Sequence, residues 1–362
     1  MALALRILHL SHAGLPDERV ERSAWSSRSA GKEVHFAGPK SRGLSLPADP
    51  FASKSVLDFG LRSNLGEPFS SSRLVKRAKQ IVAQVKPDLV HAHDIFAGRL
   101  ATRLGVPFVY DDHEYWSKAV LANSGMVDPV SAYKSFLWGS WEEDVLSQAQ
   151  SVITVSESIA EEHRKRSHRV FTVPNFPRTV EIRDLSLPEL GKGEMASVYT
   201  GSCTPPFMRF RDTEGLTDLF RRMSIGTLKV IGDDLLRTNP PVFSLGRLSH
   251  GAMMREISKC QIGLIPWKKH WFHRYCNPNK AYEYAHAGCV VIVISTLEQV
   301  CRTLSNLCVA FEDYGEMASV MIDMASRPDD LVEKGKTIQA FARGNLVWDR
   351  FDSTINEAYR EQ

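Results

Sequence analysis

The sequence predicts an α/β protein of two domains, each built on a doubly wound parallel sheet. Three observations support this fold class. The 362 residues exceed one ordinary hydrophobic core and fit two units of about 150 to 200 residues each. Short β-branched runs alternate with helical patterns, as they do in βαβ units. A polar stretch with prolines divides these runs into two series, and two facing sheets would leave a cleft at the carboxyl ends of their strands, where such sheets bind ligands.

The first series of elements predicts a domain over residues 1–178. We expect its strands at 6–10, 33–37, 88–91, 108–110, 151–155 and 170–173. A helix is expected at 72–85, because its apolar residues fall on one face and its basic residues on the other. A second helix is expected at 131–148. Its four aromatic residues should pack against the sheet rather than contact a membrane: Tyr133, Phe136, Trp138 and Trp141.

The second series begins after a polar stretch rich in proline and leucine, which we interpret as a linker at 179–195. We then expect strands at 196–200, 227–231, 241–245, 262–265, 290–294 and 308–311. These strands predict a second domain over residues 196–345.

Composition limits the class of protein. The chain is 43% apolar and 24% charged, as is usual for soluble globular proteins, and no apolar run reaches the roughly 20 residues of a membrane span. The first ten residues resemble a strand rather than a signal peptide, so we expect a cytoplasmic protein. The six cysteines form no Cys-x-x-Cys pair, which favours reduced, buried thiols over a zinc site.

Charge is distributed unevenly between the two halves. Residues 1–178 contain 23 Lys and Arg against 19 Asp and Glu, a net charge of +4, whereas the remainder contains 22 against 23. Such basic runs are either solvated helix faces or surfaces that attract an anionic membrane or an acidic acceptor. Nucleic acid is not expected as a partner, because no aromatic residues are interleaved with the basic ones.

The densest functional pattern lies between Gly263 and Ile294. A buried strand ends at Pro266, and further on Asn277 has the character of an N-cap, with Pro278 at the first helical position. Free backbone N–H groups and the helix dipole would then form an anion site, to which Lys280 adds a full positive charge. Glu283 shares a face with Lys280 and could accept both hydroxyls of a ribose. The alternative is an ordinary capped helix with a Lys–Glu pair, closed by Gly288.

A second polar group follows the strand expected at 108–110. His113 should lie at the carboxyl end of this strand, where it can bind a sugar or acceptor hydroxyl, and Asp112 or Glu114 could fix its tautomer. His93, near the end of the preceding strand, is expected to line the same site. Because these residues lack a recognisable ligand spacing, we expect no metal. The turn at Gly14 is a weaker candidate for contact with the donor or acceptor. No Gly-x-Gly-x-x-Gly appears, which argues against a dehydrogenase.

The segment from Pro278 to Gly288 resembles the donor site of the group 1 (family 4) glycosyltransferases, which have the GT-B fold. The family's Pro-Asn-Lys-x-x-Glu-Tyr-x-x-x-Gly pattern is matched by Pro278, Asn279, Lys280, Glu283, Tyr284 and Gly288. One departure is clear: Tyr275 stands where the family's first glutamate is usual. Weaker similarities to other segments of the family occur along the chain, in the family's order, at 151–159, 173–177, 198–202, 230–233 and 347–349.

The resemblance implies an acceptor-side domain over 1–178, a nucleotide-sugar domain over 196–345, both Rossmann-like, and a last helix within 346–362 that crosses back to the first domain. It implies that His113, Lys280 and Glu283 are catalytic, with Asn279 and the turn at Gly201 beside the donor nucleotide. Diphosphate contacts are expected from Arg209 or Arg211, with Arg247 a weaker candidate near the base. Tyr275 and Asn277 are expected beside the donor sugar or acceptor.

The expected activity, implied by the resemblance, is transfer of a sugar from a nucleoside diphosphate sugar to an acceptor hydroxyl, with retained anomeric configuration and no metal cofactor. The basic first half suggests a glycan or lipid-linked acceptor at an anionic membrane surface, hence cell-surface glycan assembly. Two alternatives remain: a sugar-nucleotide epimerase of the same architecture, and a catalytically silent nucleotide-sugar-binding protein.

Overall fold

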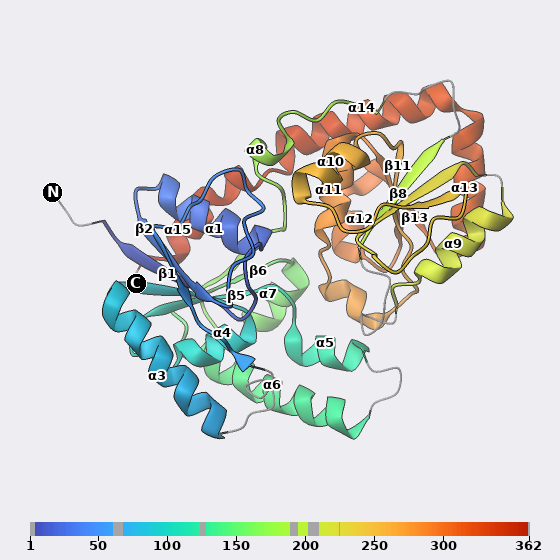
Figure 1. Ribbon diagram of the computed structural model, residues 1–362. Helices are drawn as coiled ribbons and strands as arrows, with labels where there is room; N and C mark the ends of the chain where they lie inside the picture. The colour runs from blue at the N-terminus through green and yellow to red at the C-terminus, as the bar shows by residue number, and fades with distance from the viewer. Residues whose placement is uncertain are drawn as a thin grey trace. The chain divides into compact units, whose positions relative to one another are not determined.

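The computed structural model describes residues 4–60, 68–123, 128–188, 195–201, 210–223 and 225–360 (Figure 1). Contacts divide the chain into two compact units. The first contains Met1–Pro174 together with Trp348–Gln362, and the second contains Asn175–Val347. The boundary therefore falls just before the stretch expected to be a linker.

The first unit is built on a seven-stranded parallel sheet with the order β3-β2-β1-β4-β5-β6-β7. Its strands are β1 (Arg6–Ser11), β2 (Glu33–Gly38), β3 (Ser53–Val56), β4 (Leu89–His93), β5 (Phe108–Asp112), β6 (Ser151–Thr154) and β7 (Val170–Thr172). The chain runs outward from β1 to β3 and then returns to place β4 on the other side of β1. Ligands of open α/β sheets bind at the carboxyl ends of strands where the order reverses in this way.

Helices cover both faces of this sheet (Figure 1). On one face lie α3 (Pro68–Val85), α4 (Asp94–Ala101) and α6 (Pro129–Gln148), which bury a core of aliphatic and aromatic residues with β1 and β4. On the other face α1 (Glu18–Ser29) contacts α15 (Asp352–Ala358). Trp348 and Ile355 are fully buried there against Ile7 and Val109, so the C-terminal segment is part of the core of the first unit. The shorter helices are α5 (Trp116–Asn123) and α7 (Glu157–His163).

The four aromatic residues of α6 divide into two pairs. Trp138 and Trp141 pack into the core, as expected, but Tyr133 is 56% exposed and Phe136 is 78% exposed. The expectation that all four pack against the sheet is therefore wrong for these two, because they lie on the part of α6 that turns away from it.

The second unit repeats this topology with six parallel strands in the order β10-β9-β8-β11-β12-β13. The strands are β8 (Ala196–Thr200), β9 (Thr227–Ile231), β10 (Val242–Ser244), β11 (Ile262–Ile265), β12 (Val290–Ile294) and β13 (Cys308–Phe311). The order reverses between β8 and β11, so the carboxyl ends of these two strands are where this sheet would bind a ligand. Two α/β units with parallel sheets confirm the predicted fold class.

The helices of the second unit include α8 (Thr179–Ile182), α9 (Thr213–Arg222), α10 (His250–Ile257), α11 (Asn279–Ala287) and α12 (Glu298–Leu304), followed by α13 (Tyr314–Ser326) and α14 (Pro328–Asn345). A short 3-10 helix, η1 (Trp271–Tyr275), precedes α11. Helix α11 packs against α14 and α10 and against the central strands β11 and β12. This packing fixes the start of α11 beside the carboxyl end of β11. Among the described residues, no helix is long and apolar enough to cross a membrane.

The packing of α11 on β11 depends on Gly263. A Cβ atom at this position would lie 2.3 Å from Cγ of the fully buried Tyr284 ring. We expect Gly263→Ala to destabilise the protein by about 2 kcal/mol or more, since overpacking forces side chains and backbone to shift. Thermal unfolding measures the effect. Gly344→Ala is the matched control, because a Cβ there meets nothing within 4 Å and alanine is the better helix former. Equal melting temperatures for the two variants would contradict this account.

Candidate active site

Glycine turns shape the carboxyl edge of the second sheet. Gly201 follows β8 with φ +137°, and Gly232 follows β9 with φ +106°, conformations that side chains rarely adopt. The Gly201 N–H donates to the carbonyl of Ile231 (2.8 Å). A Cβ atom on Gly232 would lie only 3.2–3.3 Å from the Gly201 backbone. The two turns thus pack backbone against backbone, which leaves this edge open for a ligand to approach the main chain.

Lys280 lies at this edge, in the first turn of α11. Its ammonium group donates to the carbonyl oxygen of Thr200, the last residue of β8. Its Nζ lies 4.5 Å from the centre of the Tyr199 ring and 5.6 Å from the centre of the Trp267 ring. A Cβ atom on Gly201 would meet Nζ at 2.7 Å, so the absence of a side chain there makes room for the ammonium group. The structure therefore brings the predicted residues Lys280 and Gly201 together.

Arg211 places a second positive charge against the Trp267 ring that Lys280 contacts. Its guanidinium lies 5.2 Å from the centre of the same Trp267 ring, and the backbones of Arg211 and Trp267 form an isolated antiparallel bridge. One indole thus contacts two cations, an arrangement that holds both in place through cation–π attraction. Both cations therefore lie within 5.6 Å of the centre of one ring, and each can bind a phosphate group.

The other predicted arginines differ from Arg211. Arg247 is 72% exposed and pairs with Asp234, with 3.1 Å between Nε and Oδ2, so its side chain is committed to a surface ion pair. Arg209 lies outside the described residues.

The start of α11 differs from the prediction by one residue. The helix begins at Asn279, and Pro278, rather than Asn277, is the N-cap. The Asn277 side chain is buried and accepts a hydrogen bond from the Tyr282 hydroxyl, so the prediction that it caps the helix is wrong. Because Pro278 has no side-chain acceptor, the cap makes no side-chain hydrogen bond to the first turn, where Asn279 and Lys280 lie. Those N–H groups and the helix dipole retain the character of an anion site.

Glu283 follows Lys280 by one turn, and it is 5% exposed. Its Oε1 lies 3.2 Å from Nε2 of His250, the first residue of α10. A carboxylate has two oxygen atoms that can each accept more than one hydrogen bond, so Glu283 can accept hydrogen bonds from ribose hydroxyls as well. Tyr275 lies in η1, half-buried, with its ring 5.9 Å from that of Phe272.

The first unit concentrates histidines and carboxylates where its strand order reverses. His113 follows β5, and its Nε2 lies 3.0 Å from Nδ1 of the fully buried His93. Its Nδ1 lies 3.5 Å from the Asp94 carboxylate, and its Nε2 lies 3.6 Å from the Asp111 carboxylate. Burial alone would lower the pKa of His113, but Asp94 and Asp111 outweigh it and raise the pKa to about 9. His113 is therefore a cation at neutral pH.

The carboxylates beside His113 are held in different ways. Asp111 is fully buried and bound by Arg19 of α1, whose Nη2 lies 2.7 Å from Oδ1. Burial opposes ionisation of Asp111, yet Arg19 and His113 hold its pKa well below the usual value. Asp94 has a positive φ of 65° and accepts from the backbone N–H of His113 (3.0 Å), and burial raises its pKa to about 7. A non-glycine residue in this conformation stores strain, which is common at functional sites.

The remaining predicted residues of the first unit contribute less. The prediction that Asp112 fixes the tautomer of His113 is wrong, because its fully buried carboxylate contacts Nε2 of His163 (2.7 Å) and accepts from the Tyr110 hydroxyl (2.8 Å). Asp94 and Asp111, rather than Asp112, are the carboxylates beside the ring nitrogens of His113. Glu114 is exposed, and Gly14 lies in the turn after β1, where a Cβ atom would lie 3.4 Å from the carbonyl oxygen of Lys40.

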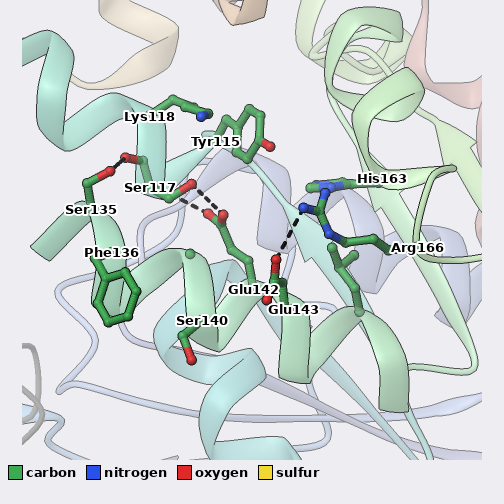
Figure 2. Close-up of a pocket in the computed structure, with 12 residues that line it drawn as sticks. Tyr115, Ser117, Lys118, Ser135, Phe136, Ser140, Glu142, Glu143, His163 and Arg166 are labelled. Atoms are coloured by element: carbon green, nitrogen blue, oxygen red, sulfur yellow. Dashed lines mark hydrogen bonds and ion pairs between the residues drawn. The ribbon is translucent and has the colours of Figure 1, made fainter.

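A cavity of about 270 Å³, lined in part by His163, lies between α5, α6 and α7 (Figure 2). Tyr115 and Ser117 form one side, and Phe136 and Arg166 contribute from α6 and the chain after α7. Glu142 accepts a hydrogen bond from the backbone N–H of Ser117 (3.0 Å), and its other carboxylate oxygen contacts the Ser117 hydroxyl. Hydroxyl groups, charges and aromatic rings together make this cavity suited to a polar, hydroxylated molecule.

Glu142 makes the stability of the first unit dependent on pH. Burial, reinforced by the nearby Asp112 carboxylate, raises the pKa of Glu142 from 4.5 to about 7. Because the carboxyl ionises more readily in the unfolded chain, raising the pH through this window favours unfolding. We expect Glu142→Gln to unfold several degrees higher than wild type at about pH 8, and to lose this advantage at about pH 5. Glu143→Gln, a change at a residue 64% exposed, is the control, and a pH-independent difference between Glu142→Gln and wild type would contradict the assignment.

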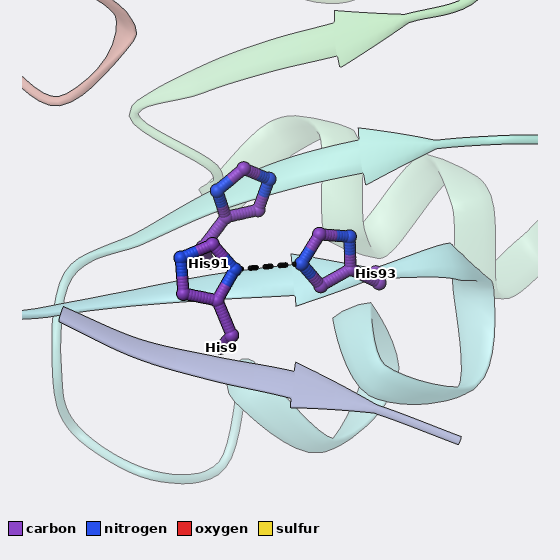
Figure 3. Close-up of side chains that lie close together, drawn as sticks. All are labelled: His9, His91 and His93. Atoms are coloured by element: carbon purple, nitrogen blue, oxygen red, sulfur yellow. Dashed lines mark hydrogen bonds between the residues drawn. The ribbon is translucent and has the colours of Figure 1, made fainter. Parts of the chain in front are cut away.

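Two overlapping groups of described side chains lie close enough to hold a metal ion: His9, His91 and His93, and His93, Asp111 and His113. In the first group the rings of His91 and His93 are stacked, 4.3 Å apart and 10° from parallel, and His9 stacks on His91 at 4.7 Å (Figure 3). Lone pairs of imidazole lie in the ring plane, so stacked rings do not converge on one ion. In the second group Arg19 already neutralises Asp111. Hydrogen bonds and ion pairs link the side chains of both groups to one another.

Four residues of the candidate site were not predicted from the sequence as site residues: Arg19, Asp94, Asp111 and Trp267, whose ring faces Lys280 and Arg211. Asp94 follows β4, and Asp111 lies in β5 directly after the expected strand end at residue 110. The rule that polar residues at strand ends face a ligand could therefore have found them. Arg19 gives no local signal, since its partner Asp111 is 92 residues away.

Comparison with known proteins gives the same architecture. Residues 20–178 match the model of Glycosyltransferase Family 4. Among solved structures, sucrose-phosphate synthase from Thermosynechococcus elongatus is 16% identical with a TM-score of 0.78, covering 98% of each chain. The Anabaena protein HepE in complex with UDP and glucose is 13% identical with a TM-score of 0.67, again over 98% of each chain. A glycosyltransferase from Rickettsia africae is 11% identical with a TM-score of 0.65, over 99% of this chain and 100% of that one. No curated protein sequence matches significantly.

Proposed function

We propose that this chain, a glycosyltransferase with a Glycosyltransferase Family 4 domain and the GT-B fold, transfers a sugar from a nucleoside diphosphate sugar to an acceptor hydroxyl with retained anomeric configuration. The observation that carries the proposal is the pair of cations, Lys280 and Arg211, held on Trp267 at the carboxyl edge of the second sheet. Retention of configuration rests on the sequence resemblance.

The second unit has the groups that a donor nucleotide needs. The diphosphate would bind Lys280, Arg211 and the backbone N–H groups at the start of α11, beside the Gly201 turn. Glu283 would accept the ribose hydroxyls. Charge develops on the leaving diphosphate as the glycosidic bond breaks, and fixed cations stabilise that charge without reorganising. HepE, which has the same fold, is described in complex with UDP and glucose, which supports a nucleotide donor.

We propose that transfer requires no bridging metal. Lys280 and Arg211 supply the positive charge that a divalent ion supplies to phosphates in metal-dependent transferases. Activity should therefore persist in excess EDTA, and loss of activity that Mg²⁺ or Mn²⁺ restores would refute this part.

The first unit would contribute His113 to the sugar or to the acceptor hydroxyl. The cavity between α5, α6 and α7 would receive part of a hydroxylated acceptor. We propose a glycan or lipid-linked acceptor at the cytoplasmic face of a membrane, in cell-surface glycan assembly. The exposed Tyr133 and Phe136 on α6 and the basic surface of α3 support attraction to such a membrane. If the chain bound anionic and neutral vesicles equally well, the proposal of a membrane location would be contradicted. The proposal of sugar transfer would not be affected.

The test of the reaction is product analysis. Uridine, guanosine and adenosine diphosphate sugars are incubated with the purified chain, with and without a bacterial lipid extract as acceptor source. We expect one donor to release its nucleoside diphosphate and its sugar to appear in the lipid fraction. A changed sugar on an intact nucleotide, without acceptor, would indicate an epimerase instead, and no turnover of any donor would indicate a silent binding protein.

A further inference from the structure

Three imidazoles form a hydrogen-bonded row that runs inward from His113. Nε2 of His113 lies 3.0 Å from Nδ1 of His93, and Nε2 of His93 lies 2.9 Å from Nδ1 of His9. The inner contact is the dashed line in Figure 3. His93 and His9 are fully buried, whereas the His113 side chain is 14% exposed. The row therefore begins at the site and ends in the core of the first unit.

We infer that His93 and His9 are positioning residues, which hold His113 in its doubly protonated form with Nε2–H directed toward His93 and Nδ1–H on the side of Asp94. This inference rests on the proposed function and assigns the part that His113 plays in it. His113 is then a charged hydrogen-bond donor in sugar transfer, and it does not act as a base.

The hydrogen bonds of the row can donate in either of two directions, inward from His113 or outward toward it. Each contact between two ring nitrogens holds one proton, and a neutral imidazole donates from one nitrogen while it accepts at the other. If His113 donates inward, His93 and His9 both carry their hydrogen on Nε2, and His113 can carry a second proton on Nδ1. If the row donates outward, His113 accepts at Nε2 and is neutral.

The charges around the row favour the inward direction. The carboxylates of Asp94 and Asp111 lie 3.5 and 3.6 Å from the ring nitrogens of His113, and Arg19 supplies one positive charge to Asp111. A cation on His113 balances the second carboxylate once Asp94 ionises, above its pKa of about 7. His93 and His9 are held neutral, because burial lowers the pKa of each well below its ordinary value. The titratable groups that face His113 are His12 from the turn after β1, Arg19 from α1, His91, His93 and Asp94 from β4 and α4, and Asp111 from β5.

His91 supports the arrangement from the side. Its Nε2 lies 3.2 Å from Oδ2 of Asp111, and its Nδ1 lies 2.7 Å from the hydroxyl of Tyr359, the residue after α15. That hydroxyl is also 3.0 Å from the Ser27 hydroxyl. His91 can therefore donate to Asp111 and accept from Tyr359, which fixes Asp111 in the orientation that faces His113. The C-terminal segment thus contributes to the site through Tyr359.

The direct test is nitrogen NMR of the histidine rings in the full chain at about pH 7. We expect both ring nitrogens of His113 to be protonated, and His93 and His9 to carry hydrogen on Nε2 only. A neutral His113, or hydrogen on Nδ1 of His93 or His9, would overturn the inference. The measurement needs no substrate, so its outcome is independent of whether the chain transfers a sugar.

Variants at His93 give a second readout. His93→Leu removes the inner acceptor, so the pKa of His113 should fall from about 9, and kcat for sugar transfer should fall with little change in donor KM. His93→Gln restores an acceptor oxygen, so it should recover most of the loss in the His113 pKa and most of the loss in kcat. His168→Gln, an exposed histidine of the same unit, is the control. An unchanged His113 pKa in folded His93→Leu would overturn the positioning role.

The same spectra distinguish a proton from a metal ion. A divalent ion would need the lone pairs of His113 Nε2 and His93 Nδ1, which the inward row fills with one proton. Zinc sulfate titrated to one equivalent should leave these signals unchanged. Stoichiometric zinc binding with loss of the shared proton would overturn the inference and identify a metal site.

Discussion

Lys280→Met is expected to lower kcat/KM for sugar transfer about 10²- to 10³-fold, the usual loss when one fixed group that stabilises developing charge is removed. Methionine keeps the unbranched stem of the side chain, so packing against Tyr199 and Trp267 should survive while the ammonium group is lost. Steady-state kinetics with the preferred donor measures the effect, and thermal unfolding checks the fold.

The control is Lys259→Met, a change at a lysine that is 60% exposed and pairs with Glu256 on the surface of the same unit. Its kinetics should match wild type. If Lys280→Met retained near-wild-type activity, the diphosphate could not lie where we place it.

Glu283→Ala is expected to raise the donor KM about 10- to 100-fold, because hydrogen bonds to a charged group contribute about 1.5 to 3 kcal/mol. The assignment to the ribose can be isolated with a 2′-deoxy donor. Removing either the carboxylate or the 2′-hydroxyl should cost affinity, and removing both should cost little more than removing one.

Glu333→Ala, at a residue 73% exposed on α14, should change neither KM nor the discrimination between the two donors. If Glu283→Ala weakened both donors equally, the carboxylate would act on the fold or on His250 rather than on the ribose.

Much of the fold follows from burial, which the sequence reveals. The strands at 262–265 and 290–294 were predicted with the observed bounds, because parallel strands covered on both faces are continuous apolar runs. β3 was missed because Ser53–Val56 lies at the edge of its sheet and is largely exposed, so it needs no apolar pattern. β4 and β5 extend two residues beyond their predicted ends, since His93 and Asp112 are polar yet fully buried.

The part of the site that lies within one short segment of sequence could be predicted. The segment that contains Lys280 and Glu283 has its own caps, spacing and charges, so its chemistry could be inferred without tertiary structure. Even here Asn277 was misassigned, because its side chain bonds to Tyr282 rather than to the helix start. The contacts that orient His113 join residues that are distant in sequence: His9 to His93 and Arg19 to Asp111 are 84 and 92 residues apart. No periodicity records such pairs, which depend on the order of strands in the sheet.

The most direct test of the central claim is a thermal-shift comparison of wild type and Lys280→Met with uridine, guanosine and adenosine diphosphates. A ligand that binds the folded state at about 100 times its Kd stabilises it by about 2.7 kcal/mol. We predict that one of the three diphosphates raises the melting temperature of wild type and leaves that of Lys280→Met unchanged. No shift with any diphosphate, or an equal shift in both proteins, would contradict a nucleotide site at the carboxyl edge of the second sheet.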